Sequence, residues 1–162
     1  MKRTTLAETQ CCSIARALDL IGEWWTPLIL RDIFRGKRRF DDLLESLDIS
    51  RNVLTDRLRT LVESGVLDRV KYQDRPERYE YVLTARGLDL FPVLVSLMGW
   101  GDRWLAQKEG PPVVMWHQPC GKPVEAQLTC VHCGEEINLH NVKLEPGPGA
   151  PVGTNKLSAE KA

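Results

Sequence analysis

Four side chains near the C-terminus combine the residue types and the spacing of a metal site. They lie in WHQPCGKPVEAQLTCVHCGEE, residues 116–136, where His117 and Cys120 form an HxxC pair and Cys130 and Cys133 form a CxxC pair. Each short turn brings two ligands to one point, and one imidazole with three thiolates completes a tetrahedral set for zinc. A closed set of this kind leaves no position for a substrate. The segment therefore predicts a structural zinc rather than a catalytic one.

The same cysteines fit two alternatives that the sequence leaves open. The module could hold no metal, or it could be closed by a disulfide between Cys130 and Cys133 or between Cys120 and Cys133. A CxxC pair is also a redox motif, but redox pairs usually begin a helix. Gly121 and Gly134 follow the second cysteine of each pair, and they favour tight turns instead.

Length and composition are typical of a globular protein. The chain has 162 residues, of which 43% are hydrophobic and 27% charged, and its apolar runs are too short to cross a membrane. The start MKRTTLAETQCC has no apolar stretch after its charges, so no secretory signal is expected and the cytoplasm is the expected location. Five cysteines, an odd number, fit reduced thiols or metal ligands better than a disulfide framework.

The charge balance argues against a general electrostatic affinity for nucleic acid or membranes. There are 22 basic and 22 acidic residues, which gives a formal net charge of zero. The run RGKRR at 35–39 is nevertheless locally basic. Binding to a polyanion is therefore expected only at a local patch.

Apolar periodicity predicts the elements that precede the metal-binding segment. Spacings of i, i+3, i+4 and i+7 mark helices, and alternation marks strands. The expected helices lie at 14–21, 24–34, 40–47, 51–64 and 85–106, and the expected strands at 67–72 and 78–84. Ser13, Ser50 and Thr84 are the expected N-caps. Pro92 is expected to bend the last helix, which has apolar residues on two sides, so one side needs a partner.

Short helices followed by a charged hairpin indicate a winged helix–turn–helix. The predicted fold class is mainly α with a small β-hairpin, followed by a small β zinc-ribbon-like module. The predicted domains are a winged-helix domain with dimerisation helices at 1–108, the zinc-ribbon-like module at 113–141, and a disordered tail at 142–162. The tail is rich in Pro and Gly and has little apolar bulk.

The polar face of the fourth helix predicts a surface that reads DNA. Arginine and asparagine hydrogen-bond to guanine and adenine edges in the major groove, and a helix N-terminus favours phosphate. The basic run and the charged hairpin tip are placed to hold the DNA backbone. The expected contacts are Lys37, Arg38, Arg39, Ser50, Arg51, Asn52, Thr55, Arg59, Lys71, Arg75 and Arg78. The alternative is that this face is only solvated.

Residues 11–104 resemble the HxlR family of bacterial winged helix–turn–helix regulators, which have a MarR-like winged helix. The motifs occur in order: Cys12, LDLIGEWW, LILRDI, GxxRF, ISxxVLTDRL, SGxLDR, a wing with Pro76 and Tyr81, and LTARG. The resemblance implies a homodimer formed through the terminal helices and an inverted-repeat operator in double-stranded DNA. The sequence departs from the family at Ser13, where Pro is usual, and at Trp24, where Lys is commoner.

The resemblance also implies a sensing role for one cysteine. Some members of the family sense oxidants or electrophiles through a cysteine at the start of the first helix, which Cys12 matches, with Cys11 beside it. A thiol at a helix N-terminus is partly stabilised as thiolate. Cys12 is therefore a redox-sensing candidate, and a disulfide to the partner subunit is one outcome. The alternative is a half-buried structural cysteine.

Together these patterns predict a DNA-binding transcriptional regulator, with repression assigned by analogy. An enzyme is not expected, because the sequence shows no Ser–His–Asp arrangement, no phosphate loop and no open metal site. A thiol-redox-responsive regulator that uses Cys12 and a protein-interaction adaptor that uses the zinc-ribbon-like module are the alternatives. A small-molecule or oxidant effector is left open.

Overall fold

The structure is a computed structural model that describes residues 11–150. The chain divides into two compact units, Met1–Val95 and Ser96–Ala162, each of which is treated by itself below. The division falls within a helix, whereas the domain prediction ended the first domain at residue 108. Among the described residues, no helix is both long and apolar enough to span a membrane.

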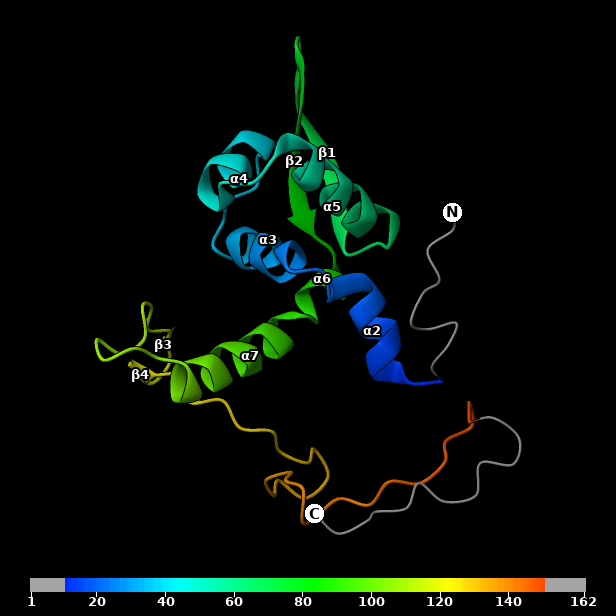
Figure 1. The fold of residues 1–162 in the computed structure, drawn as a ribbon, viewed down its shortest axis with the longest axis vertical. Coiled ribbons are helices and arrows are strands. Elements are labelled where there is room, and N and C mark those ends of the chain that lie inside the picture. Colours follow the sequence, from blue (N-terminus) through cyan, green and yellow to red (C-terminus); the bar gives the residue numbers. More distant parts are fainter. Residues whose placement is uncertain (1–10, 151–162) are drawn as a thin grey trace. The chain divides into compact units, whose positions relative to one another are not determined.

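The first unit has the element order of a winged helix–turn–helix, as predicted (Figure 1). Its helices are α2 (Ser13–Ile21), α3 (Trp25–Phe34), α4 (Phe40–Leu47), α5 (Arg51–Glu63) and α6 (Ala85–Leu88), and its strands are β1 (Leu67–Asp74) and β2 (Glu77–Leu83). In this order α4 and α5 form the helix–turn–helix, and the β1–β2 hairpin forms the wing.

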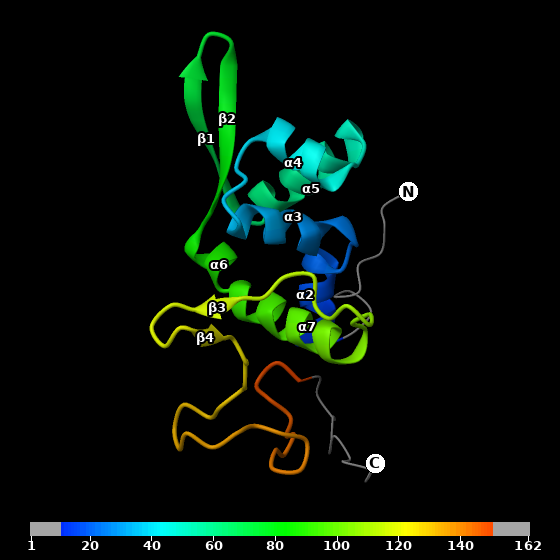
Figure 2. The ribbon, with the colours of Figure 1, turned by 90° about the vertical axis from the view of Figure 1, so that its left-hand side faces the viewer.

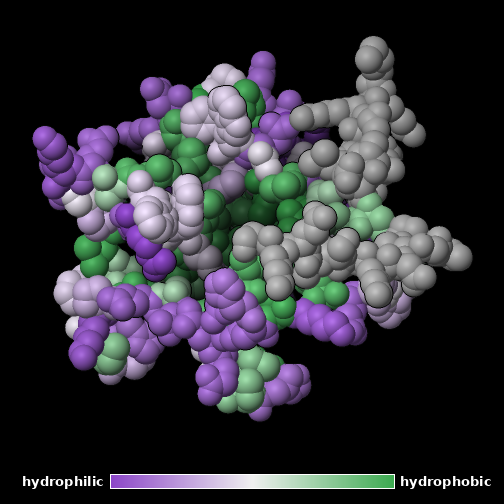
Figure 3. All heavy atoms as spheres, turned by 60° about the horizontal axis from the view of Figure 1, so that its bottom comes forward, coloured by the Kyte–Doolittle hydropathy of each residue, from purple (hydrophilic) through white to green (hydrophobic). Residues whose placement is uncertain are grey.

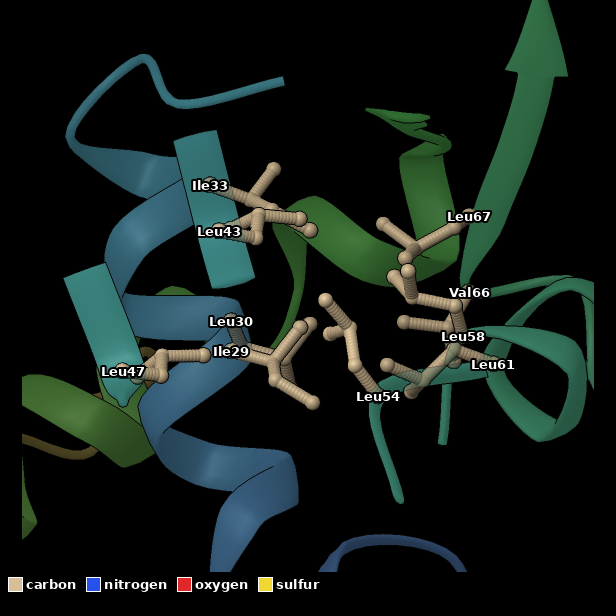
Figure 4. Packing of buried hydrophobic residues seen from close by; sticks show 10 residues of the cluster. All are labelled: Ile29, Leu30, Ile33, Leu43, Leu47, Leu54, Leu58, Leu61, Val66 and Leu67. Atoms are coloured by element: carbon tan, nitrogen blue, oxygen red, sulfur yellow. The ribbon is translucent and has the colours of Figure 1, made fainter. Parts of the chain in front are cut away.

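One hydrophobic core fixes α3, α4 and α5 against each other (Figure 4). Leucines at i, i+4 and i+7 of α5 turn inward, and Leu54, Leu58 and Leu61 are at most 1% exposed. The remaining buried members of the cluster are Ile29, Leu30, Ile33, Leu43, Leu47, Val66 and Leu67. Burying each such side chain stabilises the fold by about 1.5–3 kcal/mol. The core thus positions α5 with its other face exposed.

The turn between α4 and α5 is short and locally determined. Asp48 ends α4 in the left-handed region, with φ of 50°, a conformation that Asp tolerates better than most residues. Ser50 then caps α5, because its hydroxyl oxygen accepts a hydrogen bond from the Val53 amide at 3.3 Å. The predicted N-cap at Ser50 is therefore confirmed.

The wing is longer than the sequence predicted. Its strands pair antiparallel from Leu67–Leu83 to Asp74–Glu77, and the register shifts between Lys71 and Gln73. In both views the hairpin extends beyond α4 and α5 (Figures 1 and 2). The predicted turn of five residues is shorter in the structure, because the polar residues at its edges also pair.

The start of α2 differs from the prediction. The N-cap is Cys12, not Ser13, and no side chain caps the helix. The apolar spacing of Ile14, Ala17, Leu18 and Ile21 predicts that these residues face the core, but Ile14 is 70% exposed and Leu18 45% exposed, while Ala15 is buried. The helical periodicity was correct, but it did not indicate which side of α2 faces this unit's core.

The predicted helix at 85–106 is two helices. Thr84 caps α6 as expected, since its Oγ1 accepts from the Gly87 amide at 3.1 Å, but α6 ends at Leu88. A second helix, α7, covers Phe91–Trp104. Pro92 has no N–H with which to continue the ladder, so the helix breaks rather than bends.

Hydrophobic surface is open to solvent on α7. Leu97, Trp100 and Trp104 are each more than half exposed, while Val95 is buried. The face drawn in Figure 3 shows hydrophobic side chains between polar ones. These exposures agree with the prediction that one apolar side of this helix needs a partner.

The second unit contains little regular structure beyond α7. Strands β3 (Trp116–His117) and β4 (Lys122–Pro123) pair antiparallel, and an isolated bridge joins Thr129 to Glu136. No residue between 111 and 150 is buried. Residues 151–162 of the predicted disordered tail lie outside the described part of the chain.

Candidate nucleic-acid interface

The exposed face of α5 carries the predicted reading residues. Arg51, Asn52, Thr55 and Arg59 are all exposed, on the side opposite the buried leucines. The cap at Ser50 fixes the first turn, so Arg51 and Asn52 stand where a helix presents its N-terminal side chains to a groove. The structure therefore places these predicted contacts on one helix face.

Arg51 is held by the helix before it. Its Nη2 lies 3.3 Å from Oδ1 of Asp41, and its guanidinium lies 5.5 Å from the centre of the Phe40 ring. Both partners belong to the first turn of α4. Because the pair is exposed on both sides, it orients the arginine without contributing much stability.

Arg59 also has a carboxylate partner. Its Nη2 donates to Oδ1 of Asp56 at 2.9 Å, one turn earlier on α5. Asp56 therefore offsets the charge of Arg59 on the face that would meet DNA. Asn52 and Thr55 have no side-chain hydrogen bond within residues 11–150, so they remain available for base edges.

The wing contains paired and unpaired cations. Lys71 donates to Glu77 Oε1 at 2.7 Å, and the Tyr79 hydroxyl donates to the other oxygen at 2.8 Å. The Lys71 ammonium, together with Tyr79, lowers the pKa of the Glu77 carboxyl. Arg75 and Arg78 are exposed near the tip, and no described residue forms an ion pair with either.

Arg39 connects the helix–turn–helix to the wing. Its Nε donates to Oε1 of Glu80 at 3.1 Å, and its guanidinium lies 4.6 Å from the Tyr72 ring centre. The hydrogen bond to Glu80, with Tyr72 nearby, raises the pKa of Arg39. A backbone hydrogen bond also connects the two elements here, because the Tyr81 amide of the wing donates to the Arg38 carbonyl at 2.8 Å.

The other two cations of the basic run differ in exposure. Arg38 is exposed, and Lys37 is half-buried, close enough to Asp32 to help lower the pKa of that buried carboxyl. Half of the predicted cationic contacts thus have a carboxylate partner: Arg39, Arg51, Arg59 and Lys71. That each of these residues contacts DNA stays a prediction.

Sequence reasoning missed the side chains that hold these cations. Asp41 lies 10 residues before Arg51, and Glu80 lies 41 residues after Arg39. No local spacing rule links residues so far apart.

The four predicted metal ligands form two separate pairs. His117 Nδ1 lies 3.2 Å from Cys120 Sγ in one turn, and Cys130 and Cys133 share a second turn. The amides of His132 and Cys133 donate to the Cys130 sulfur and lower the pKa of its thiol. No three metal-binding side chains converge on one point in residues 11–150. The single zinc centre stays a prediction.

Cys12 occupies the N-cap position of α2 and is exposed. The nearby backbone amides of Ala15 and Ile14, together with the charge of Arg16, lower the pKa of this thiol. This local geometry is the one expected for a thiol with increased thiolate character. A structural half-buried cysteine, the alternative, is not what the structure shows.

Comparisons with known proteins agree with this geometry. The model of a family described as HxlR-like helix-turn-helix matches residues 20–109. The uncharacterized HTH-type transcriptional regulator Rv3095 of Mycobacterium tuberculosis is 54% identical over 137 residues, which cover 85% of this chain and 87% of the relative.

Solved structures give the same result. The candidate transcription factor PA1607 has a TM-score of 0.75 and 34% identity, covering 84% of this chain and 95% of that one. The redox regulator HypR in its reduced form has a TM-score of 0.54 and 30% identity, covering 58% of this chain and 96% of its own. With a family model that spans more than half of its length, the chain belongs to the HxlR-like helix–turn–helix family of transcriptional regulators.

Proposed function

We propose that this protein is a sequence-specific DNA-binding regulator that acts as a homodimer on an inverted-repeat operator. The observation that carries the proposal is the capped first turn of α5, which exposes Arg51, Asn52 and Thr55 together. Arg51 suits a guanine edge and Asn52 an adenine edge in the major groove. The helix N-terminus and Ser50 suit a phosphate. The wing cations Arg75 and Arg78 would contact the neighbouring backbone.

Operator selection from random DNA tests the reading residues. The wild-type protein should enrich one inverted repeat, and Asn52→Ala or Arg51→Ala should lose preference at a symmetric pair of positions. Each loss should be about 1–3 kcal/mol of discrimination. Lys143→Ala is the matched control, because it removes one positive charge from the C-terminal unit. Unchanged sequence preference in both α5 variants would contradict the assignment of α5.

The dimer is proposed from the apolar side chains left exposed on α7 and on α2. Leu97, Trp100 and Trp104 on α7, and Ile14 on α2, would be covered by a second copy. Light scattering of the purified chain should give twice the monomer mass. Leu97→Glu should shift it to the monomer and weaken operator binding, and a wild-type protein that remains monomeric at micromolar concentration would contradict this part.

In this proposal the protein represses transcription by occupying its operator in the cytoplasm. Residues 113–141 form an accessory module that takes no part in the DNA contact. Transcription in vitro from a template bearing the selected operator tests the direction of control. Added protein should lower the yield of transcript, and Asn52→Ala should restore it.

A second candidate function is a response to thiol oxidation. It is favoured by the exposed Cys12 thiol with its lowered pKa, and by the structural likeness to HypR, a redox regulator. Hydrogen peroxide would transfer one oxygen to the Cys12 thiolate to give a sulfenic acid, and its other oxygen would leave as hydroxide. The thiol of Cys12 in a second subunit would then displace water and form an intersubunit disulfide.

Operator binding after peroxide treatment tests this second function. Oxidised wild-type protein should change its operator affinity and run as a covalent dimer without reductant. Cys12→Ser should do neither, and Cys11→Ser is the matched control that should behave as wild type. An oxidation response that persists in Cys12→Ser would exclude Cys12 as the sensor.

A further inference from the structure

The C-terminal module has ordered turns but no core. No residue between 111 and 150 is buried, and Leu128, Val131 and Leu139 are 64%, 93% and 75% exposed. Hydrogen bonds between backbone groups still define its two turns and its short strands. A segment of this size cannot be held by so little apolar contact. Some other interaction must therefore stabilise it.

The first turn has the geometry of half a metal site. The Gly121 amide donates to the His117 carbonyl at 2.8 Å, which closes the turn, and Gly121 has φ of 65°. This places His117 Nδ1 and Cys120 Sγ 3.2 Å apart on the same side. Two ligands of one tetrahedral ion lie at a similar separation, since each lies about 2.0–2.3 Å from zinc.

The second turn repeats this arrangement with two thiols. The Gly134 amide donates to the Cys130 carbonyl at 2.7 Å, and Gly134 has φ of 77°. The amides of His132 and Cys133 point at the Cys130 sulfur, as they do where a turn stabilises a metal-bound thiolate. The Ile137 amide donates to the Leu128 carbonyl at 2.7 Å, which closes the loop around this pair.

We propose that the two turns are preformed halves of one zinc site, and that a single Zn²⁺ joins them through His117, Cys120, Cys130 and Cys133. The ion replaces the missing core as the interaction that stabilises residues 113–141. The three thiols lose their protons on binding, and His117 binds through Nδ1 as neutral imidazole. The set is closed, so the role is structural. The proposal does not depend on DNA binding.

Metal content of the purified full-length chain tests the site. Wild-type protein should carry one zinc ion per chain, measured by inductively coupled plasma mass spectrometry. Cys120→Ser, Cys130→Ser and Cys133→Ser should each lose it. His132→Ala, inside the second turn, and His140→Ala, after it, should retain it. His117→Cys should also retain zinc, because a fourth thiolate completes the same geometry; its success would show that loss in other variants is not simple misfolding.

Cobalt substitution and proteolysis complete the test. Co²⁺ exchanged into the wild-type chain should show the intense visible bands of a tetrahedral site with thiolate ligands. Removal of zinc by a chelator should make residues 113–141 sensitive to protease while operator binding persists. Wild-type protein without metal, a titration of free thiols showing a disulfide in the module, or zinc retained by the cysteine variants would each overturn the proposal.

Discussion

Arg39 and Glu80 join two elements that are 41 residues apart in the chain, with Nε of the arginine 3.1 Å from Oε1 of the glutamate. Arg39 is the N-cap residue of α4, and Glu80 lies in β2. The Tyr72 ring, on β1, lies beneath the same guanidinium. One side chain therefore contacts both strands of the wing and the start of the helix–turn–helix.

Loss of this contact should weaken DNA binding without removing a positive charge. Glu80→Gln keeps Arg39 and removes a negative charge, which by simple electrostatics would strengthen binding. We expect the opposite, a loss of about 2–5-fold in operator affinity, because the wing is less firmly positioned. Fluorescence anisotropy with a labelled operator measures it.

Glu63→Gln is the matched control for this prediction. It removes the same charge from the exposed last residue of α5, which has no ion pair with Arg39. Its affinity should equal or exceed that of wild type. If Glu80→Gln binds as well as Glu63→Gln, Arg39 has no positioning role and acts only as a cation.

The N-cap hydrogen bond of Ser50 should contribute measurably to the free energy of unfolding. Ser50→Ala removes the oxygen that accepts from the Val53 amide, so the free energy of unfolding should fall by about 0.5–2 kcal/mol. Ser50→Asp keeps an acceptor and adds a negative charge at the helix start, so it should keep most of the stability. Urea denaturation of the three proteins compares them, and equal midpoints for wild type and Ser50→Ala would refute the cap.

Asp32 should make the fold sensitive to acid. It is 1% exposed, and its Oδ1 accepts from Arg31 Nε at 2.8 Å. Burial acts to raise the pKa of this carboxyl, but Arg31, Ser46 and Lys37 outweigh it and hold the pKa below the ordinary value. A lowered folded-state pKa contributes stability above the unfolded-state pKa, which is lost as the pH falls through the folded-state value.

Asp32→Asn tests this dependence. The substitution should cost roughly 1–3 kcal/mol at neutral pH, because a charged acceptor is lost in a buried site. The difference from wild type should shrink as the pH is lowered below about 4, where the unfolded carboxyl takes up a proton. Denaturation at a series of pH values measures both effects, and a constant difference across that range would be the contrary result.

The Cys12 thiol should react at lower pH than an ordinary thiol. The amides of Ala15 and Ile14 lower its pKa, so the thiolate should form at a lower pH than in an ordinary cysteine. Because the thiolate is the reactive form, alkylation by iodoacetamide should accelerate at that lower pH too. Peptide mass spectrometry of the Cys12→Ser and wild-type proteins assigns the modified site. An alkylation rate that rises only when the pH approaches the pKa of a free cysteine would contradict the predicted geometry.

The sequence was informative wherever the determinant of structure is local. Ser50 caps the helix that follows it, and Leu54, Leu58 and Leu61 recur on one side of that helix, so α5 was predictable from its own residues. The cap at Cys12 was missed because Ser is the commoner cap and stands one position later. Here the backbone conformation, with Cys12 extended, decides the boundary.

Interactions between distant residues could not be predicted in this way. Neither the pairing of Arg39 with Glu80 nor that of Arg51 with Asp41 has a spacing signal. The break between α6 and α7 was missed because a proline such as Pro92 is compatible with either a bent helix or a broken one, and the prediction chose the bend. His117 lies near Cys120 and Cys130 near Cys133, as their short spacing predicts, but the sequence did not show whether the two turns meet, and the zinc site stays a prediction.

The carboxylates beside Arg39, Arg51, Arg59 and Lys71 change how the protein should respond to salt. Each phosphate that the protein neutralises releases condensed salt cations from the DNA. The logarithm of the binding constant therefore falls with the logarithm of the salt concentration, with a slope of about 0.9 for each phosphate contact. When one of these arginine or lysine side chains leaves its carboxylate (Glu80, Asp41, Asp56 or Glu77) to bind a phosphate, that carboxylate becomes free. The free carboxylate then attracts a salt cation from solution. Ion uptake by the protein thus offsets ion release by the DNA. The measured slope should be smaller than the number of phosphates in the complex.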